Sequence, residues 1–173
     1  MLHAFLLVQS GIPVLQSGDE IGQLNDYSYH EDPLKASDSR YLHRGNLNWK
    51  EVAERKKTDS RPGRIFRALR KLEKLRAEHD LFKNDADTWT LETANDHILG
   101  IGRYYHEEKL LALFNFSEEE QTARTGEREE YINLLTGKKC SADNVTLQGH
   151  DFIWLYHTYQ KQTEKKNKRG TLR

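Results

Sequence analysis

The spacing of apolar residues changes several times along the chain, and each change predicts a different element. Residues 1–9 are mostly apolar with few helix breakers, which predicts the last turns of a buried helix that Gly11 terminates. The apolar run at residues 12–15, bounded by Gly11 and Gly18, predicts a short strand covered on both faces. A helix, a tight turn and a buried strand together indicate an α/β unit.

A long polar stretch follows, from Asp19 to about Ser60. It has no convincing periodicity and is rich in Asp, Ser, Asn, Tyr, His and Arg. Compact domains rarely tolerate such a long irregular segment unless it binds or covers something. The sequence therefore predicts a functional loop here.

Helical periodicity returns between Arg64 and His79, where apolar residues fall on one face and basic and acidic residues on the other. Ser60 and Pro62 stand where the start of a helix favours a capping hydroxyl and a preset φ. These residues predict an amphipathic helix.

After Asn84 the apolar positions alternate in short runs separated by turn signals, among them Gln148-Gly149. This pattern predicts an antiparallel β-sandwich over residues 87–157. Gly100 and Gly102 fall inside one run, which indicates a bulge or a close backbone contact. Six aromatic residues are expected to provide most of the core: Trp89, Tyr104, Phe114, Phe116, Phe152 and Trp154.

Length and charge limit the classes of protein that fit. A chain of 173 residues has room for one domain, or one domain and part of another. Basic and acidic residues both number 27, so the net charge of zero gives no electrostatic argument for a nucleic acid or a membrane as partner. Residues 158–173 are basic and almost free of apolar side chains, which predicts a disordered tail.

The single cysteine, Cys140, excludes an internal disulfide framework and fits a reducing cytosol. The opening residues lack the features of a signal peptide and of a membrane span. We expect a cytoplasmic protein, with secretion of a longer parent left open. The histidines show no metal-ligand spacing with one another or with Cys140, so neither a metal nor a cofactor is expected.

Three segments, in order, resemble one family of carbohydrate-active enzymes. Residues 11–29, GIPVLQSGDEIGQLNDYSY, are similar to the eighth barrel strand and the following loop of the α-amylase superfamily, glycoside hydrolase family 13. Residues 24–44 contain LND and DSRYLHR, which resemble the corresponding segments of amylosucrases. HILGIGRYYHEEKLLALFNFSEEEQT and DFIWLYH resemble the C-terminal sheet domain of that family.

The resemblance covers about residues 1–157 and implies an α/β plus all-β fold. Residues 1–86 would be the end of a (β/α)8 TIM barrel, comprising strand eight, a substrate-side loop and the last helix. Residues 87–157 would be a C-terminal antiparallel β-sandwich. Met1 would fall in the helix before strand eight, so the chain would correspond to a C-terminal portion of the parent enzyme.

The parent implied by the resemblance transfers the glucosyl unit of sucrose to an α-glucan through a covalent glucosyl-enzyme. Retaining transfer needs two carboxyl groups about 5 Å apart, and a barrel builds such a site from several strands. In this family the catalytic carboxylates precede the matching region. We therefore assign no catalytic residue and expect the chain alone to be inactive and to self-associate through apolar surface of residues 1–20.

The resemblance suggests three substrate-binding residues, Arg40, Asp26 and Tyr27. In amylosucrases the arginine matching Arg40 pairs with an aspartate of an early barrel loop and closes the glucosyl pocket. That aspartate is absent here, and the alternative for Arg40 is a surface salt bridge. Tyr27 could stack on a sugar ring or simply pack within the loop.

Five further residues are expected to shape the loop: Asp19, Glu20, Asp38, His43 and Arg44. Asp19 and Glu20 are adjacent, so in an extended segment their side chains point in opposite directions and cannot act together on one bond. We expect Asp19 to accept backbone N–H groups in a turn and Glu20 to pair with a basic residue of the loop.

Two alternatives remain open at the level of sequence. One is a sucrose hydrolase or another α-glucosidase or α-amylase family member. The other is a non-catalytic carbohydrate-binding β-sandwich module. A module of that kind would present a planar row of exposed aromatic rings. Four aromatic residues stand instead at alternating, core-like positions: Trp89, Phe114, Phe116 and Trp154.

Overall fold

The computed structural model describes residues 1–159. The chain divides into two compact units, Leu2–Glu78 and the part from His79 onward, to which Met1 also belongs. The predicted basic tail, residues 158–173, lies outside the described residues except for its first two positions. The first of these, Thr158, ends the last strand.

The first unit is a set of short helical elements with one long helix. Among residues 1–159 no helix has the length and apolar character needed to cross a bilayer. The elements are α1 (Leu2–Val8), η1 (Asp19–Ile21), η2 (Tyr27–Glu31), η3 (Ser39–His43), α2 (Trp49–Glu54) and α3 (Arg61–Glu78).

The predicted buried strand at residues 12–15 is not formed. This segment is irregular, and the side chains of Ile12 and Val14 are 86% and 78% exposed. A parallel strand forms only beside other strands that take up its backbone hydrogen bonds. The first unit contains no strand among its described residues, so the apolar run has nothing to pair with.

The long helix predicted from the periodicity is confirmed as α3. The hydroxyl of Ser60 accepts a hydrogen bond from the N–H of Gly63 at 3.0 Å, as expected of a capping residue. Leu69 and Leu72 are buried on the apolar face of α3. Sequence periodicity did not reveal the short helix α2, which Asn48 caps by accepting hydrogen bonds from Lys50 and Glu51.

Arg76 ties α3 to the end of α1. Its guanidinium donates hydrogen bonds to the carbonyl oxygens of Leu7, of Gln9 at 3.2 Å and of Gly11 at 2.8 Å. The last carbonyls of a helix have no partner within the helix, and here a side chain from α3 supplies one. Burial lowers the pKa of Arg76.

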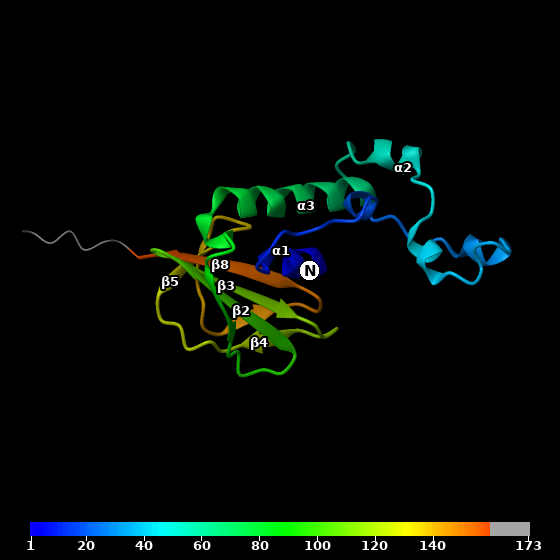
Figure 1. Ribbon diagram of the computed structural model, residues 1–173. Helices are drawn as coiled ribbons and strands as arrows, with labels where there is room; N and C mark the ends of the chain where they lie inside the picture. Colours follow the sequence, from blue (N-terminus) through cyan, green and yellow to red (C-terminus); the bar gives the residue numbers. More distant parts are fainter. Residues whose placement is uncertain (160–173) are drawn as a thin grey trace, which may run out of the picture. The chain divides into compact units, whose positions relative to one another are not determined.

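The second unit is an antiparallel β-sandwich, as predicted. Its larger sheet has the order β1-β2-β3-β8-β5-β6, and a second sheet pairs β4 with β7. Figure 1 shows β8 running beside β3, with β2 on the other side of β3. The elements are η4 (Asp80–Phe82), β1 (Asp87–Leu91), β2 (Ile98–Tyr105), β3 (Glu108–Asn115), β4 (Gln121–Ala123), β5 (Glu130–Asn133), β6 (Lys139–Ser141), β7 (Val145–Leu147) and β8 (Phe152–Thr158).

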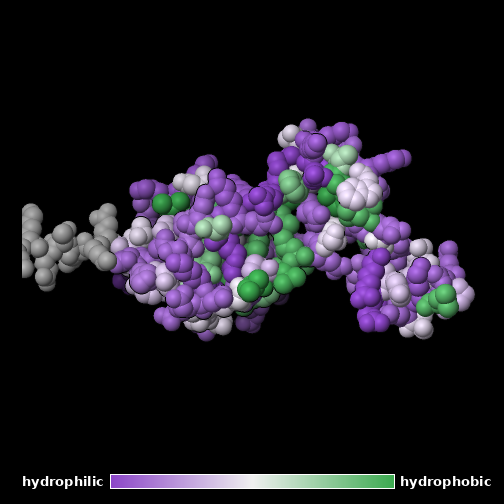
Figure 2. All heavy atoms as spheres, turned by 45° about the horizontal axis from the view of Figure 1, so that its top comes forward, coloured by the Kyte–Doolittle hydropathy of each residue, from purple (hydrophilic) through white to green (hydrophobic). Residues whose placement is uncertain are grey.

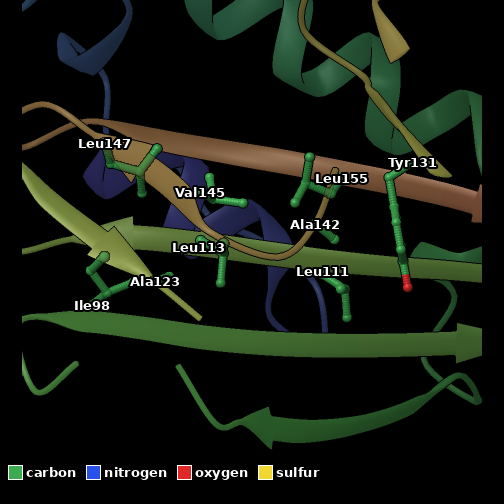
Figure 3. Close-up of a cluster of buried hydrophobic side chains, with 9 residues drawn as sticks. All are labelled: Ile98, Leu111, Leu113, Ala123, Tyr131, Ala142, Val145, Leu147 and Leu155. Atoms are coloured by element: carbon green, nitrogen blue, oxygen red, sulfur yellow. The ribbon is translucent and has the colours of Figure 1, made fainter. Parts of the chain in front are cut away.

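The core between the two sheets is mainly aliphatic (Figure 3). Residues paired across an antiparallel ladder project from the same face, so Leu111 and its partner Leu155 lie side by side. Each such side chain contributes about 1.5–3 kcal/mol when fully buried. The nine buried residues are Ile98, Leu111, Leu113, Ala123, Tyr131, Ala142, Val145, Leu147 and Leu155.

The expectation of an aromatic core is correct only in part. Phe114 and Trp154 are fully buried, and Phe152 is partly buried. Trp89, Tyr104 and Phe116 are instead exposed at more than a third of their surface. Period-two alternation shows which residues share a face, but not how far the covering layer extends over that face.

The opposite face of the larger sheet carries a buried arginine. Arg103 donates hydrogen bonds from Nε to the carbonyl oxygen of Leu81 and from Nη2 to that of Lys83, both at 2.8 Å. The ring of Phe82 lies 5.2 Å from that of Trp154, so η4 packs against this face. Arg103 therefore holds η4 in place through its backbone carbonyls.

Candidate functional site

The turn around η1 positions the first two predicted acidic residues. Asp19 accepts a hydrogen bond from the N–H of Gln16 at 3.0 Å and lies 3.3 Å from Nε2 of His3. Asp19 thus has the turn-forming role expected of it. Glu20 was expected to pair with a basic side chain, and within residues 1–159 it has no such ion pair; it accepts a hydrogen bond from the N–H of Gly18 at 2.9 Å.

Close packing fixes this turn against α3. Gly22 has a φ of +65°, and a Cβ built on it would come within 2.4 Å of the Cδ1 atom of Ile65. A side chain at position 22 would therefore be both strained and in collision with α3. Ile21 beside it is fully buried.

Three hydrogen bonds bring the two halves of the loop together. Asp26 donates its N–H to the carbonyl oxygen of Leu42 at 2.8 Å, and Gln16 donates Nε2 to that of His43 at 2.7 Å. Gln23 donates Nε2 to the carbonyl oxygen of Gly45 at 3.2 Å. As a result residues far apart in the sequence line common hollows.

A small hollow of about 80 Å³ includes two of the predicted residues, Asp19 and His43. Nδ1 of His43 lies 3.1 Å from Oδ1 of Asn25, which orients the ring. The remaining lining residues are Gln16, Ser17, Gly18, Gln23, Leu24 and Asn25.

A larger open hollow of about 340 Å³ includes two further predicted residues, Asp26 and Arg44. Carboxylates, cations, amide and hydroxyl groups and two tyrosine rings all face it. The full lining is Asp26, Ser28, Tyr29, Asp32, Lys35, Tyr41, Arg44, Gly45 and Asn46. Figure 2 shows that the surface of the loop is mostly hydrophilic, with a small apolar area.

The carboxylates of the larger hollow are held in their ionised form. The hydroxyl of Ser28, 2.6 Å from Oδ1 of Asp26, lowers the pKa of Asp26, and the N–H of Ser28 adds to this. Lys35 lies 2.8 Å from Asp32 and lowers the pKa of that carboxyl, while its own pKa is raised. These groups can accept and donate hydrogen bonds to a ligand, but none is prepared to act as a general acid.

Asp38, Arg40 and Tyr27 do not line either hollow. Arg40 forms a two-point ion pair with Asp38, with 2.8 Å from Nε to Oδ1 and 2.7 Å from Nη2 to Oδ2. Arg40 lowers the pKa of Asp38 to about 2. Arg40 therefore has the surface salt bridge that was its alternative role, and Tyr27 is exposed.

Sequence reasoning did not single out Ser28, Lys35 and Asn46, which line the larger hollow. The spacing of Asp32 and Lys35 was an available signal, because residues three apart face one another across a helical turn. Within residues 1–159 no three His, Cys, Asp or Glu side chains are grouped so as to hold a metal ion. Cys140 is half-buried, and burial raises the pKa of its thiol.

Comparison with protein families gives a match in the second unit. The model Glyco_hydro_42C, described as the β-galactosidase C-terminal domain, matches residues 103–153. These residues run from β2 into β8 and include most of the β-sandwich.

Solved structures extend the likeness to nearly the whole chain. A complex of an AmyP variant with maltotriose aligns with a TM-score of 0.69 and 19% identity, covering 89% of this chain and 33% of that one. A maltogenic amylase from S. marinus aligns at 0.60 and 18% identity, covering 90% and 18%. The noncanonic maltogenic α-amylase AmyB from Thermotoga neapolitana aligns at 0.63 and 15% identity, covering 92% and 36%.

At this level of identity the alignments establish the fold. The chain has the fold of a segment of amylase-type enzymes, in which helices precede antiparallel β-sheets. It spans about a third of the length of the AmyP chain. The AmyP variant was solved in complex with maltotriose, and the other two structures are maltogenic amylases.

Proposed function

We propose that this chain is the C-terminal part of an enzyme of the α-amylase superfamily that acts on α-glucosides. Residues 1–86 would complete a (β/α)8 barrel and supply a substrate-side loop, and residues 87–157 would form the C-terminal β domain. The observation that carries the proposal is the larger hollow, with its ionised aspartates, cations and tyrosines on a loop that follows the GIPVLQ segment.

The chemistry of the hollow suits a sugar. A pyranose ring offers hydroxyl groups around its rim and flat C–H surfaces on its faces. Asp26 and Asp32 can accept hydrogen bonds from hydroxyl groups, Lys35 can donate them, and the ring of Tyr41 offers an apolar surface. Nζ of Lys35 lies 5.8 Å from the centre of that ring, so polar and apolar contacts are available close together.

At the finer level we propose an amylosucrase-like activity, the transfer of glucosyl from sucrose to an α-glucan. The LND and DSRYLHR segments carry this part of the proposal. Sucrose hydrolysis is the alternative within the same class. Because AmyP was solved in complex with maltotriose and with maltose, maltooligosaccharides are tested beside sucrose.

The first experiment assays the chain as it stands for release of fructose and glucose from sucrose and from maltotriose. We expect no turnover above a heat-denatured control, because Asp19 and Glu20 are each engaged with a backbone N–H and do not form an acid pair. Turnover by the purified chain would contradict the proposal that catalytic carboxylates come from elsewhere.

The second experiment measures binding in the larger hollow by NMR titration with sucrose and with maltotriose. We expect saturable shifts of Lys35 and Tyr41 signals, and a loss of at least fivefold in affinity for Lys35→Met. Lys50→Met, an exposed lysine on α2, is the matched control. If neither sugar perturbs the hollow, its assignment as a sugar site is wrong.

A longer polypeptide that contains this chain in frame, assayed with sucrose and with maltotriose, tests whether the enzyme is a transferase, a hydrolase or an amylase. With sucrose as substrate, an insoluble or extended α-glucan as product supports the transferase, whereas free glucose alone supports the hydrolase. Activity on maltotriose with none on sucrose would favour an amylase and remove the amylosucrase assignment.

A further inference from the structure

Four aromatic side chains lie on one face of the second unit, and we call this group the aromatic strip: Trp89, Tyr104, His157 and Tyr159. The rings of Tyr104 and Tyr159 are 6.3 Å apart, and those of His157 and Tyr159 are 4.6 Å apart. Trp89, Tyr104 and Tyr159 are 37%, 39% and 38% exposed.

The strip lies on the core-facing side of the larger sheet, beyond the area that β4 and β7 cover. Trp89 pairs with Gly102, which pairs with Leu111 of the core cluster, so these three residues share a face. Tyr104 pairs with Lys109, and Lys109 with His157, on that same face. His157 in turn lies 5.3 Å from the ring of Tyr131, which is at one end of the cluster in Figure 3.

Trp89 is held flat, which leaves one face of its indole available. A Cβ at Gly102 would lie 2.1 Å from Cε2 and 2.2 Å from Cζ2 of Trp89, so the ring rests directly on the glycine backbone. A ring that packs on the sheet through one face presents its other face outward. This arrangement explains why Gly102 occupies the middle of a strand.

Mostly buried polar contacts hold Lys109, which is the cross-strand partner of Tyr104 in the strip. Lys109 forms an ion pair with Glu127 at 2.7 Å, and the hydroxyl of Tyr131 donates a hydrogen bond to Glu127 at 2.9 Å. The side chains of Lys109 and Glu127 are mostly buried, which limits their movement. Tyr104 therefore has a side chain of restricted movement, Lys109, as its cross-strand neighbour.

An exposed carboxylate stands at the edge of the strip. Asp87 pairs with Tyr104 across β1 and β2, and its side-chain carboxylate has no hydrogen-bond or ion-pair partner among residues 1–159. Its negative charge disfavours the phosphates of a nucleic acid or of a lipid surface. It suits a ligand that offers hydroxyl donors beside a flat apolar face.

We propose that the aromatic strip is a second sugar-binding site, separate from the loop hollow, and that it binds a linear α-glucan. Pyranose faces stack on Trp89 and on Tyr104, while Asp87 accepts hydrogen bonds from sugar hydroxyl groups. The class of sugar rests on the proposed function, whereas the presence of a stacking site rests on the strip alone. Trp89 is thus partly exposed, contrary to the core-like position inferred from the sequence, although the rings of Tyr104 and Tyr159 meet at 66° and do not form a planar row.

The test is an NMR titration of the whole chain with maltohexaose, followed through the indole N–H signals of its three tryptophans. We expect a saturable shift of the Trp89 signal and none of the signal of buried Trp154. Trp89→Ala and Tyr104→Ala should each weaken binding at least fivefold. Trp89→Phe keeps a smaller ring and should lose less, and Phe116→Ala, an exposed aromatic outside the strip, should bind as the parent does.

One result would overturn the proposal: the absence of a saturable Trp89 shift in the unsubstituted chain, which does not depend on the folding of any variant. If the Trp89 signal then moves when residues 160–173 are deleted, the basic segment after Tyr159 is the occupant instead of a sugar. NMR shifts of Lys35 and Tyr41 report on the larger hollow separately from the Trp89 signal. The sugar site in the hollow and the sugar site on the strip can therefore be rejected independently.

Discussion

The buried side chain of Asn115 uses both its amide nitrogen and its amide oxygen in hydrogen bonds. Asn115 is fully buried, and its Nδ2 donates to the carbonyl oxygens of Glu119 at 2.7 Å, Gln148 at 2.9 Å and Leu147 at 3.2 Å. Its Oδ1 accepts from the N–H and hydroxyl of Ser117. One side chain thus joins the end of β3 to the turn after β7.

Replacing Asn115 with Ala should lower the free energy of unfolding by about 2–4 kcal/mol, because several buried carbonyl groups lose their donor together. Chemical denaturation of the two proteins measures the difference. Ser117→Ala removes only one contact to the same oxygen and should cost about 1 kcal/mol or less. Equal effects of the two substitutions would mean that Asn115 is not the centre of this network.

The Asp38–Arg40 pair predicts a pH dependence within the loop. Arg40 lowers the pKa of Asp38 from 3.8 to about 2 in the folded protein. The stabilisation from this carboxylate is therefore fully present above pH 3.8 and is lost as the pH falls through 2. In Arg40→Gln the NMR-detected midpoint of Asp38 should move up toward 3.8, and an unchanged midpoint would contradict the pairing.

At the scale of elements, the position of α1 depends on α3. Arg76→Met should remove the donors to Leu7, Gln9 and Gly11 and destabilise the first unit by about 2 kcal/mol. Amide hydrogen exchange should then accelerate in α1 before it accelerates in the middle of α3. Arg70→Met is the control, since Arg70 is exposed and pairs with Glu73 on the same helix.

Elements whose stability is local were predictable from sequence, and those that depend on distant partners were not. The apolar stripe of α3 and its Ser60 cap act within a few residues. The strand expected at residues 12–15 needs neighbours that the first unit does not provide.

The candidate site shows the same contrast between contacts within a few residues and contacts between distant segments. The turn role of Asp19 was predictable because its partner, Gln16, is three residues away. The larger hollow was not, because Asp26 and Arg44 meet only through the hydrogen bonds that join residues 16–26 to residues 42–45. Exposure of Trp89 depends on how far β4 and β7 reach across the sheet, which no local pattern records.

At the scale of the whole molecule, the apolar segment at residues 12–15 predicts association between copies of the chain. Ile12 and Val14 are the side chains most clearly exposed there, and unpaired extended backbone beside them can pair with another chain. Ile12→Lys and Val14→Lys should reduce the sedimentation-detected oligomer. Leu34→Lys, at an equally exposed position in the loop, should leave it unchanged. A monomeric parent chain at high concentration would refute this expectation.

The placement of β8 has a consequence for synthesis on the ribosome. β5 joins the larger sheet through β8, and β8 in turn pairs with β3, so the strand that comes last in chain order among residues 1–159 lies in the interior of the sheet. A nascent chain that ends before Phe152 has β1, β2 and β3 ready to pair but no route by which β5 and β6 can join them. The second unit can therefore complete its folding only after β8 has left the ribosome, and until then the growing polypeptide carries an open edge on β3.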